Sequence, residues 1–320
     1  MLSDATGSEL DSVARQGISR RKFLGLCPVA VASVATIGQT STAVVDDKSK
    51  QLAREHGNDP ALLIDLTKCV GCGMCVSACK KDNDLESRAD QPALGPEAVL
   101  ASSNWTVVEG RNVAGEVSPV KRQCMHCLEP ACASVCFVKA LEKTEAGPVS
   151  YDPNKCVGCR FCLMACPFGI PTFDWDATLG QVSKCDMCAD RTSQGLPTAC
   201  AEACPSGALT FGHRDGLLSE AHSRMTVEPD KYVDHVYGES EVGGTSVLYI
   251  SDVPFDKLGF ASLGTEPLPE YTWRITRWIP PVAMGLGAAL VTLYARRMKV
   301  LEEKEEEEER ETLGAGREEL

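Results

Sequence analysis

The chain has 320 residues, of which 43% are hydrophobic and 24% charged, and this composition predicts a folded protein of about two domains. Its net charge of −13 argues against a nucleic-acid binder that depends on phosphate contacts. Cysteine is the unusual component, because 16 of the 17 cysteines fall into four groups of four between Cys69 and Cys204.

A basic and then apolar segment opens the chain. The residues SRRKFL at 19–24 are followed by an apolar run to Gly38 and by the small residues STA at 41–43. This arrangement resembles a twin-arginine export signal, although a basic cytosolic leader has similar features. We expect residues 1–43 to be a signal peptide that is removed together with Cys27, and the mature protein to lie in the periplasm.

Four cysteine groups follow along the chain. They are Cys69, Cys72, Cys75 and Cys79; Cys124, Cys127, Cys132 and Cys136; Cys156, Cys159, Cys162 and Cys166; and Cys185, Cys188, Cys200 and Cys204. The first and third match the C-x2-C-x2-C-x3-C spacing of bacterial ferredoxins, and the other two lengthen its middle. A short loop can supply three thiolates to a 4Fe–4S cubane, whereas the fourth cysteine usually reaches a second cluster. The spacing therefore predicts four 4Fe–4S clusters with ligands exchanged between paired groups.

Other uses of these cysteines remain open. Disulfides suit an oxidising compartment, but repeated C-x2-C-x2-C loops favour one shared metal centre over separate bridges. The fourth group alone also suits tetrahedral zinc, although Cys204-Pro205 repeats the ferredoxin ending. His126, inside the second group, is an alternative ligand, but we expect it to lie beside a cluster.

Short strands and helices are predicted around the groups. Residues 61–66 lead into the first group, 149–151 lead into the third, and 208–211 follow the fourth. Strand, cysteine loop, helix and strand form the ferredoxin unit. The sequence thus predicts an α+β fold with two doubled bacterial-ferredoxin-like modules.

The domain boundaries follow from this pattern. We expect a four-cluster domain over 44–215 with an insertion at 80–123, in which 99–108 alternate poorly and form an insertion or partner-facing loop. Residues 216–272 contain no cysteine and form an extension that packs on the cluster domain. Within the extension, the glycine pair before 245–251 predicts a turn followed by a strand.

The C-terminal region predicts a membrane anchor. Residues 278–295 carry no charge, which meets the lower bound for a spanning helix, although a buried helix of a soluble protein is the alternative. Aromatic side chains at both ends and basic residues after the run support a span whose C-terminus stays in the cytoplasm: Trp273, Trp278, Tyr294, Arg296, Arg297 and Lys299. We expect a transmembrane helix with its flanks over 273–299 and an acidic cytoplasmic tail over 300–320.

Basic residues adjoin the cysteine groups. They are Lys68, Lys80, Lys81, Lys121, Arg122, Lys155, Arg160 and Lys184. An oxidised cluster with four thiolates carries about −2, so we expect some of these cations to offset that charge and others to be ordinary surface residues. The chain has no glycine-rich phosphate loop, nucleophile elbow or acid–base pair, which predicts electron transfer rather than catalysis.

Together these features resemble the four-cluster ferredoxin-type subunits of membrane-bound respiratory oxidoreductases, and in particular the HybA-type subunits of hydrogenase-2. The resemblance rests on the export signal, the four groups, KRQCMHC at 121–127, YGESEVGGTSVLYISDVPF at 237–255 and the C-terminal span. The chain departs from the family at Phe137, where proline commonly follows the cysteine, and in the 11-residue gap of its fourth group.

The resemblance implies a ligand pairing, in which the first group pairs with the fourth and the second with the third. It gives four ligand sets: set I is Cys69, Cys72, Cys75 and Cys204; set II is Cys79, Cys185, Cys188 and Cys200; set III is Cys124, Cys127, Cys132 and Cys166; set IV is Cys136, Cys156, Cys159 and Cys162.

The resemblance also implies a non-catalytic subunit that relays electrons through four 4Fe–4S clusters. The partners would be a periplasmic catalytic subunit, with nickel–iron hydrogenase favoured, and a quinone-reactive integral membrane subunit. A formate dehydrogenase or another molybdopterin oxidoreductase is the alternative complex. A structural or assembly protein, in which metal only holds the fold, is the alternative of another class.

Overall fold

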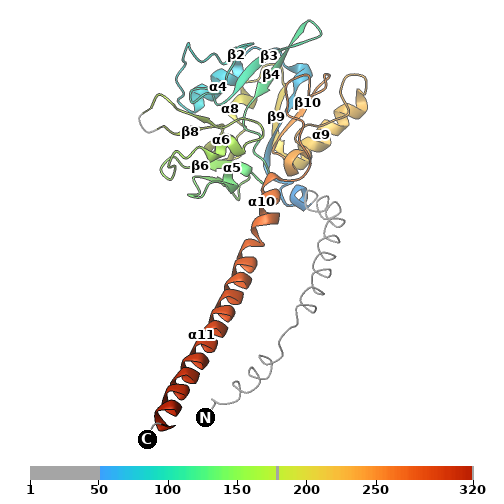
Figure 1. The fold of residues 1–320 in the computed structure, drawn as a ribbon. Coiled ribbons are helices and arrows are strands. Elements are labelled where there is room, and N and C mark those ends of the chain that lie inside the picture. Colours follow the sequence, from blue (N-terminus) through green and yellow to red (C-terminus); the bar gives the residue numbers. More distant parts are fainter. Residues whose placement is uncertain (1–50, 178–179, 319–320) are drawn as a thin grey trace.

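The structure is a computed structural model that describes residues 51–177 and 180–318. The export signal expected at 1–43, including Cys27, lies outside the described residues. A head of short strands and helices is joined through α10 (Leu268–Thr276) to one long helix, α11 (Ile279–Glu318), which projects away from it (Figure 1).

A three-stranded sheet forms the centre of the head. Its middle strand β1 (Pro60–Asp65) pairs antiparallel with β9 (Leu209–His213) and parallel with β10 (Val247–Ile250). The strands predicted at 61–66, 208–211 and 245–251 are therefore confirmed within a few residues at their ends. The extension that was expected only to pack on the cluster domain contributes β10 to this same sheet.

The sequence of β1, PALLID, is a nearly continuous apolar run because both faces of the strand are buried. Leu62 and Ile64 pack into the core that surrounds the cysteine loops. Ala61 and Leu63 face the opposite side, where helix α9 (Arg214–Val227) covers the sheet.

The cysteine loops belong to two nested modules. The outer module combines the first and the fourth cysteine groups. In it α4 (Met74–Asp82) packs against α8 (Ala199–Glu202) beside β1 and β9. The inner module is built from the chain between them. Its elements are α5 (Ala131–Ser134), β5 (Leu141–Lys143), β6 (Val149–Tyr151), α6 (Phe161–Ala165), β7 (Thr172–Phe173) and β8 (Val182–Ser183).

The inner module has the strand predicted at 149–151, now paired as β5–β6, and a second short hairpin, β7–β8. Its helices α5 and α6 lie in contact, as α4 and α8 do in the outer module. The remaining short helices are η1 (Leu66–Lys68), α7 (Ala189–Thr192) and η2 (Glu241–Gly243).

The insertion at 80–123 contains a sheet of its own. Strands β3 (Val107–Val113) and β4 (Glu116–Arg122) form a hairpin, and β2 (Leu94–Gly95) adds in parallel to β3. The expected loop at 99–108 thus runs into a strand at its end. This hairpin matters for the cysteine sites because β4 leads directly into the second group.

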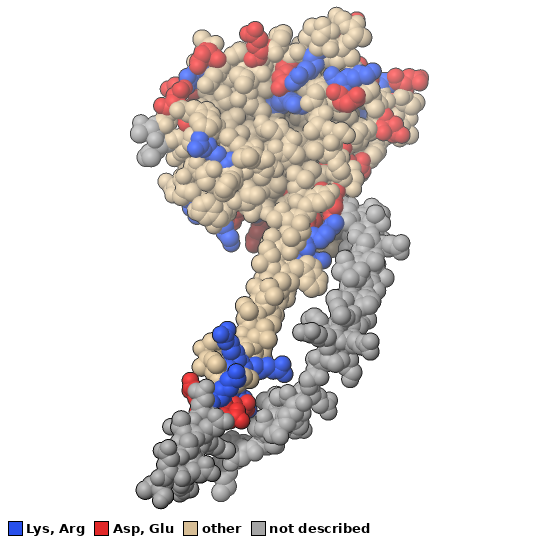
Figure 2. All heavy atoms as spheres, viewed as in Figure 1, with Lys and Arg blue, Asp and Glu red and all other residues tan. Residues whose placement is uncertain are grey.

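The stem formed by α11 is exposed on all sides over residues 279–307. Among the described residues it is the one helix long and apolar enough to cross a membrane, and its apolar window has a mean hydropathy of 1.5 with no part buried. At 1.5 Å per residue, the 18 uncharged residues at 278–295 span about 27 Å, close to the thickness of a bilayer core. Figure 2 shows this uncharged stem ending at a band of basic side chains, which the sequence assigns to Arg296, Arg297 and Lys299.

We predict that Leu63→Ala lowers the free energy of unfolding of the head by about 2–5 kcal/mol, because the side chain is fully buried between β1 and α9. Anaerobic guanidinium unfolding measures the change. The control Leu196→Ala removes a side chain that is 45% exposed and should change it by less than about 0.5 kcal/mol. Equal effects of the two substitutions would contradict the packing described for β1.

Candidate metal centres

Two of the ligand sets each line one cavity. The four cysteines of set II, Cys79, Cys185, Cys188 and Cys200, lie around a cavity that Gln123 and Thr198 also line. The four cysteines of set IV, Cys136, Cys156, Cys159 and Cys162, lie around a second cavity between α5 and α6. Cysteines that are far apart in the sequence thus converge in the combinations that the resemblance implied.

The cysteines within set I converge as well, and so do those within set III. This follows from the effects that thiols of the same set have on one another's pKa. Burial raises the pKa of Cys69, and the thiolates of Cys204 and Cys72 raise it further. In set III, burial raises the pKa of Cys127 well above its usual value, and the other three thiolates of the set add to that shift: Cys124, Cys132 and Cys166.

The sets adjoin one another in a single order. Three pairs of thiols from different sets interact: Cys75 with Cys200, Cys185 with Cys124, and Cys132 with Cys162. In each pair burial raises the pKa of the first thiol, and the thiolate of the second raises it further. The two cysteines of each pair also belong to one cluster of packed side chains, which places the sets in the order I, II, III, IV.

The end sets are the ones open to solvent. Cys72 in set I and Cys159 in set IV are exposed, whereas every cysteine of sets II and III is buried or partly buried. Exposed apolar side chains stand two residues before and after each of these cysteines in the sequence, namely Val70 and Met74 at one end and Val157 and Phe161 at the other. The cysteines at the two ends of the row are therefore the ones most open to solvent.

The four loops share one backbone conformation. The residue just before the second cysteine of each group has a positive φ: Gly71 (71°), His126 (46°), Gly158 (69°) and Met187 (61°). Glycine adopts this conformation without strain, whereas His126 and Met187 adopt it at a cost. The glycines signal the turn in the sequence, but nothing in the residue types of the other two groups does.

Backbone N–H groups reach the sulfur atoms, both from one of these turns and from the chain after the second group. The N–H of Met187 donates to Sγ of Cys185 at 3.3 Å, and the N–H of Ala140 donates to Sγ of Cys136 at 3.2 Å. Donors of this kind stabilise thiolate charge and are common around iron–sulfur clusters.

The arrangement fits a multi-iron cluster better than the alternatives. The sixteen cysteines of the described residues are all free thiols. No group of three or more His, Cys, Asp or Glu side chains within the described ranges is close enough to hold a single ion, as a tetrahedral zinc site with Zn–S bonds of about 2.3 Å requires. The cysteines of sets II and IV lie around cavities instead, as ligands of a larger centre do.

Burial makes these thiols weak acids without a metal. It raises the pKa of Cys79, Cys132 and Cys188 to about 12 each, so the thiol is the favoured form at neutral pH. Metal binding has to displace these protons, and its free energy then becomes part of the folding free energy.

Within the inner module, His126 holds the second cysteine loop against β6. Its ring is fully buried, and Nδ1 accepts a hydrogen bond from the N–H of Val149 in β6 at 3.0 Å. Burial and the nearby charge of Lys184 lower its pKa well below the usual value, so the ring is neutral. Nδ1 is therefore engaged with the backbone, and the structure gives His126 a positioning role beside set III.

Two lysines are buried among the sets. Lys184 donates from Nζ to the carbonyl oxygens of Val149 and Cys185, at 2.5 and 2.9 Å. Lys121 is fully buried and donates to Oε1 of Gln123. Burial lowers the pKa of Lys121, but the thiolates of Cys200 and Cys75 outweigh this effect and raise its pKa above the usual value. The other basic residues that adjoin the groups lie nearer the surface.

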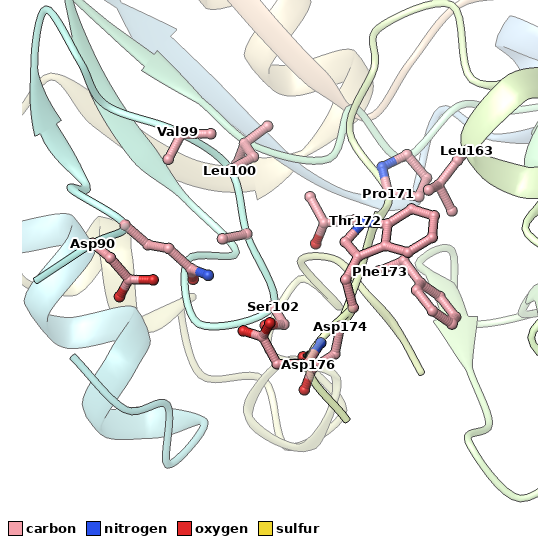
Figure 3. Close-up of a pocket in the computed structure, with 13 residues that line it drawn as sticks. Asp90, Val99, Leu100, Ser102, Leu163, Pro171, Thr172, Phe173, Asp174 and Asp176 are labelled. Carbon is pink, nitrogen blue, oxygen red and sulfur yellow. Dashed lines mark hydrogen bonds between the residues drawn. The ribbon is translucent and has the colours of Figure 1, made fainter. Parts of the chain in front are cut away.

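A cavity of about 520 Å³ lies outside the cysteine sites, between the insertion and the loop at 171–176 (Figure 3). Its lining combines apolar side chains such as Leu100 and Phe173 with the carboxylates of Asp90, Asp174 and Asp176, and it contains no cysteine. Asp90 and Asp176 are held by Arg88 at 3.0 and 2.9 Å. This bridge ties the insertion to the inner module.

Comparison with known proteins agrees with this chemistry. Residues 116–214 match the family model described as "4Fe-4S dicluster domain", and residues 60–81 match the "4Fe-4S binding domain". The hydrogenase-2 operon protein HybA of Escherichia coli O157:H7 is 33% identical over 285 residues, which cover 77% of this chain and 84% of that protein.

Other relatives are similar over comparable lengths. A protein of Nitratidesulfovibrio vulgaris is 41% identical over 314 residues, covering 94% of this chain and 83% of its own. The formate dehydrogenase iron-sulfur subunit of Haemophilus influenzae is 32% identical over 252 residues, covering 74% and 80%. The cofactors of the cysteine-rich region are accordingly 4Fe–4S clusters.

We predict that Gly158→Ala destabilises the head by about 1–2 kcal/mol through backbone strain at its positive φ. Steric contact contributes little, because the nearest atom to an added Cβ is the carbonyl oxygen of Gly180 at 3.6 Å. Anaerobic thermal unfolding measures the effect. The control is Gly264→Ala, where an added Cβ meets no atom within 4 Å and φ is ordinary, and it should have the stability of the wild type. Wild-type stability of Gly158→Ala would contradict the positive φ at that position.

Proposed function

Because the chain belongs to the family of ferredoxin-type iron–sulfur subunits that includes HybA and the iron–sulfur subunits of formate dehydrogenases, we propose that it relays electrons between a periplasmic catalytic subunit and a quinone-reactive membrane subunit. Members of this family transfer electrons within oxidoreductase complexes and are not catalytic themselves. In the proposal, sets I to IV hold four 4Fe–4S clusters, one set to each cluster.

The single order of the sets carries this proposal. When bound, 4Fe–4S clusters supply one-electron carriers, and a row of such centres is what a relay requires. This chain's residues supply thiolate ligands, N–H donors to the sulfur atoms, and surroundings in which the cysteines of sets II and III are buried or partly buried. No further chemistry is needed from the protein.

The placement of the stem supports a direction for the row. Helix α5 contacts α10, and α5 and α6 lie on the side of the head near the stem, whereas α4 lies on the far side (Figure 1). Set IV is therefore nearer the membrane in the proposed orientation, and set I faces the periplasm. We assign the exposed Cys159 end to the membrane subunit and the exposed Cys72 end to the catalytic subunit.

Membrane attachment and export complete the proposal. The exposed apolar run of α11 supports a span, and the basic residues after it support a cytoplasmic C-terminus. The twin-arginine sequence supports export of the folded protein. Such a signal together with a C-terminal span favours a hydrogenase complex, because the similar formate dehydrogenase subunit normally lacks a signal of its own.

Anaerobic co-purification of the tagged full-length chain from membranes, followed by mass spectrometry, tests the assignment of partners. A nickel–iron large subunit is the expected partner. A molybdopterin subunit would support the formate dehydrogenase alternative instead, and recovery of neither would contradict both versions.

We predict that Cys75→Ser removes the set I cluster and interrupts electron transfer. Iron and acid-labile sulfide should each fall by about one quarter, because one of four equivalent clusters is lost. Chemical analysis of anaerobically purified protein provides the measurement. Ser219→Ala on the surface of α9 serves as the control and should retain the full content. An unchanged iron content in Cys75→Ser would show that Cys75 is not a cluster ligand.

A redox titration of the same wild-type protein addresses the structural alternative. Clusters that change state between roughly −700 and +450 mV, the range of such centres, support a relay. Centres that stay silent over this range would show that metal only holds the fold.

A further inference from the structure

Lys121 is a buried cation that has no acidic partner among the residues that the structure describes. It lies in β4, its side chain is 0% exposed, and its Nζ donates to the neutral amide of Gln123. The groups that act most strongly on its charge are the thiolates of Cys200, Cys75 and Cys185 and the phenol of Tyr249, with no carboxylate among them. An ammonium in such surroundings is costly unless a negative charge compensates it.

The surrounding groups hold this ammonium in place. Tyr249, which is fully buried, donates its hydroxyl hydrogen to the carbonyl oxygen of Lys121 at 3.0 Å. Gln123 is 3% exposed and also lines the set II cavity, so the bond between the two side chains lies at the edge of that cavity. The position of Lys121 is thus fixed from both its backbone and its side chain.

Lys121 lies between two sets rather than beside one. Pro119, two residues before it in β4, lies against Gly71 in the loop of set I, and Val120 packs in the same core as Cys75 of set I and Cys200 of set II. In keeping with this placement, the charge of Lys121 lowers the pKa of Cys75, Cys69 and Cys79, each against the larger effect of burial. Lys184, the other buried lysine, differs because two backbone carbonyls already accept its hydrogen bonds. Lys121 therefore depends on the negative charge of the centres in sets I and II.

We infer that Lys121 is a fixed positive charge shared by the first two clusters, and that it raises the reduction potential of both. Reduction takes a four-thiolate cluster from about −2 to about −3, and a nearby cation stabilises the more negative state more strongly. The effect is large at Lys121 because no water screens a fully buried charge. This inference rests on the proposed function, since it needs clusters in sets I and II.

Lys80 provides a matched comparison. It follows Cys79 of set II directly, but its side chain is only half-buried, and its Nζ donates to the carbonyl oxygen of Glu86 at 2.9 Å. Solvent and salt screen its charge. Comparing the loss of one positive charge at Lys80 with its loss at Lys121 therefore distinguishes the effect of a screened cation from that of a buried cation beside the same set.

The test is an EPR-monitored redox titration with dithionite of the full-length protein in its membrane complex, for Lys121→Met, Lys121→Gln, Lys121→Arg and Lys80→Gln. Signals are assigned with Cys75→Ser for set I and Cys188→Ser for set II. In the two neutral variants at Lys121 we expect the one-electron reduction constant of both clusters to fall at least tenfold, which is about 59 mV. The clusters of sets III and IV should be unchanged, and Lys121→Arg and Lys80→Gln should stay close to the wild type.

Each other outcome decides the question. Neutral variants that shift no more than Lys80→Gln, or four clusters that shift together, would overturn the inference. If the neutral variants lose the clusters of sets I and II, retention of these clusters in Lys121→Arg supports the need for charge, and their loss in Lys121→Arg rejects it. Wild-type protein without clusters in these sets would instead refute the proposed function before any variant is compared.

Discussion

Iron–thiolate bonding is the interaction on which the head of this protein depends. Sixteen thiols lie between short strands and helices, all but Cys72 and Cys159 buried or partly buried, and several of those helices have only four or five residues. Burial raises the pKa of most of these thiols, so the arrangement is unfavourable for the thiolate until iron binds. Helices this short gain little stability by themselves, and the clusters that they surround take the place of a larger apolar core.

The central sheet provides the support that the loops lack. Strand β1 is buried on both faces and leads directly to the first cysteine group, and β9 follows the last. Strand β10 secures the other edge of β1, and Tyr249 within it reaches back to Lys121. The cysteine-free extension is therefore part of the frame that fixes the distance between sets I and II.

Much of the fold and of the cysteine sites could be predicted from the sequence, because the patterns that indicate them lie within short stretches of the chain. The cysteine intervals and the apolar runs at 61–66 and 149–151 predict loops and strands that the structure contains, because both patterns reflect neighbouring residues. The pairing of β10 with β1, the sheet within the insertion and the burial of Lys121 depend on residues far apart in the chain. The left-handed turns at His126 and Met187 were also missed, since those residue types give no signal of a positive φ.

The nesting of one module inside the other sets an order for biosynthesis. The inner module draws its eight cysteines from the continuous stretch 124–166, so its ligands are all synthesised before those of the outer module are complete. The outer module has to wait for Cys204, and its sheet waits for the strand at 247–250. That strand also pairs with the second cysteine loop, because the N–H of Val247 donates to the carbonyl oxygen of Met125, so neither module is complete until shortly before the hydrophobic stem is made.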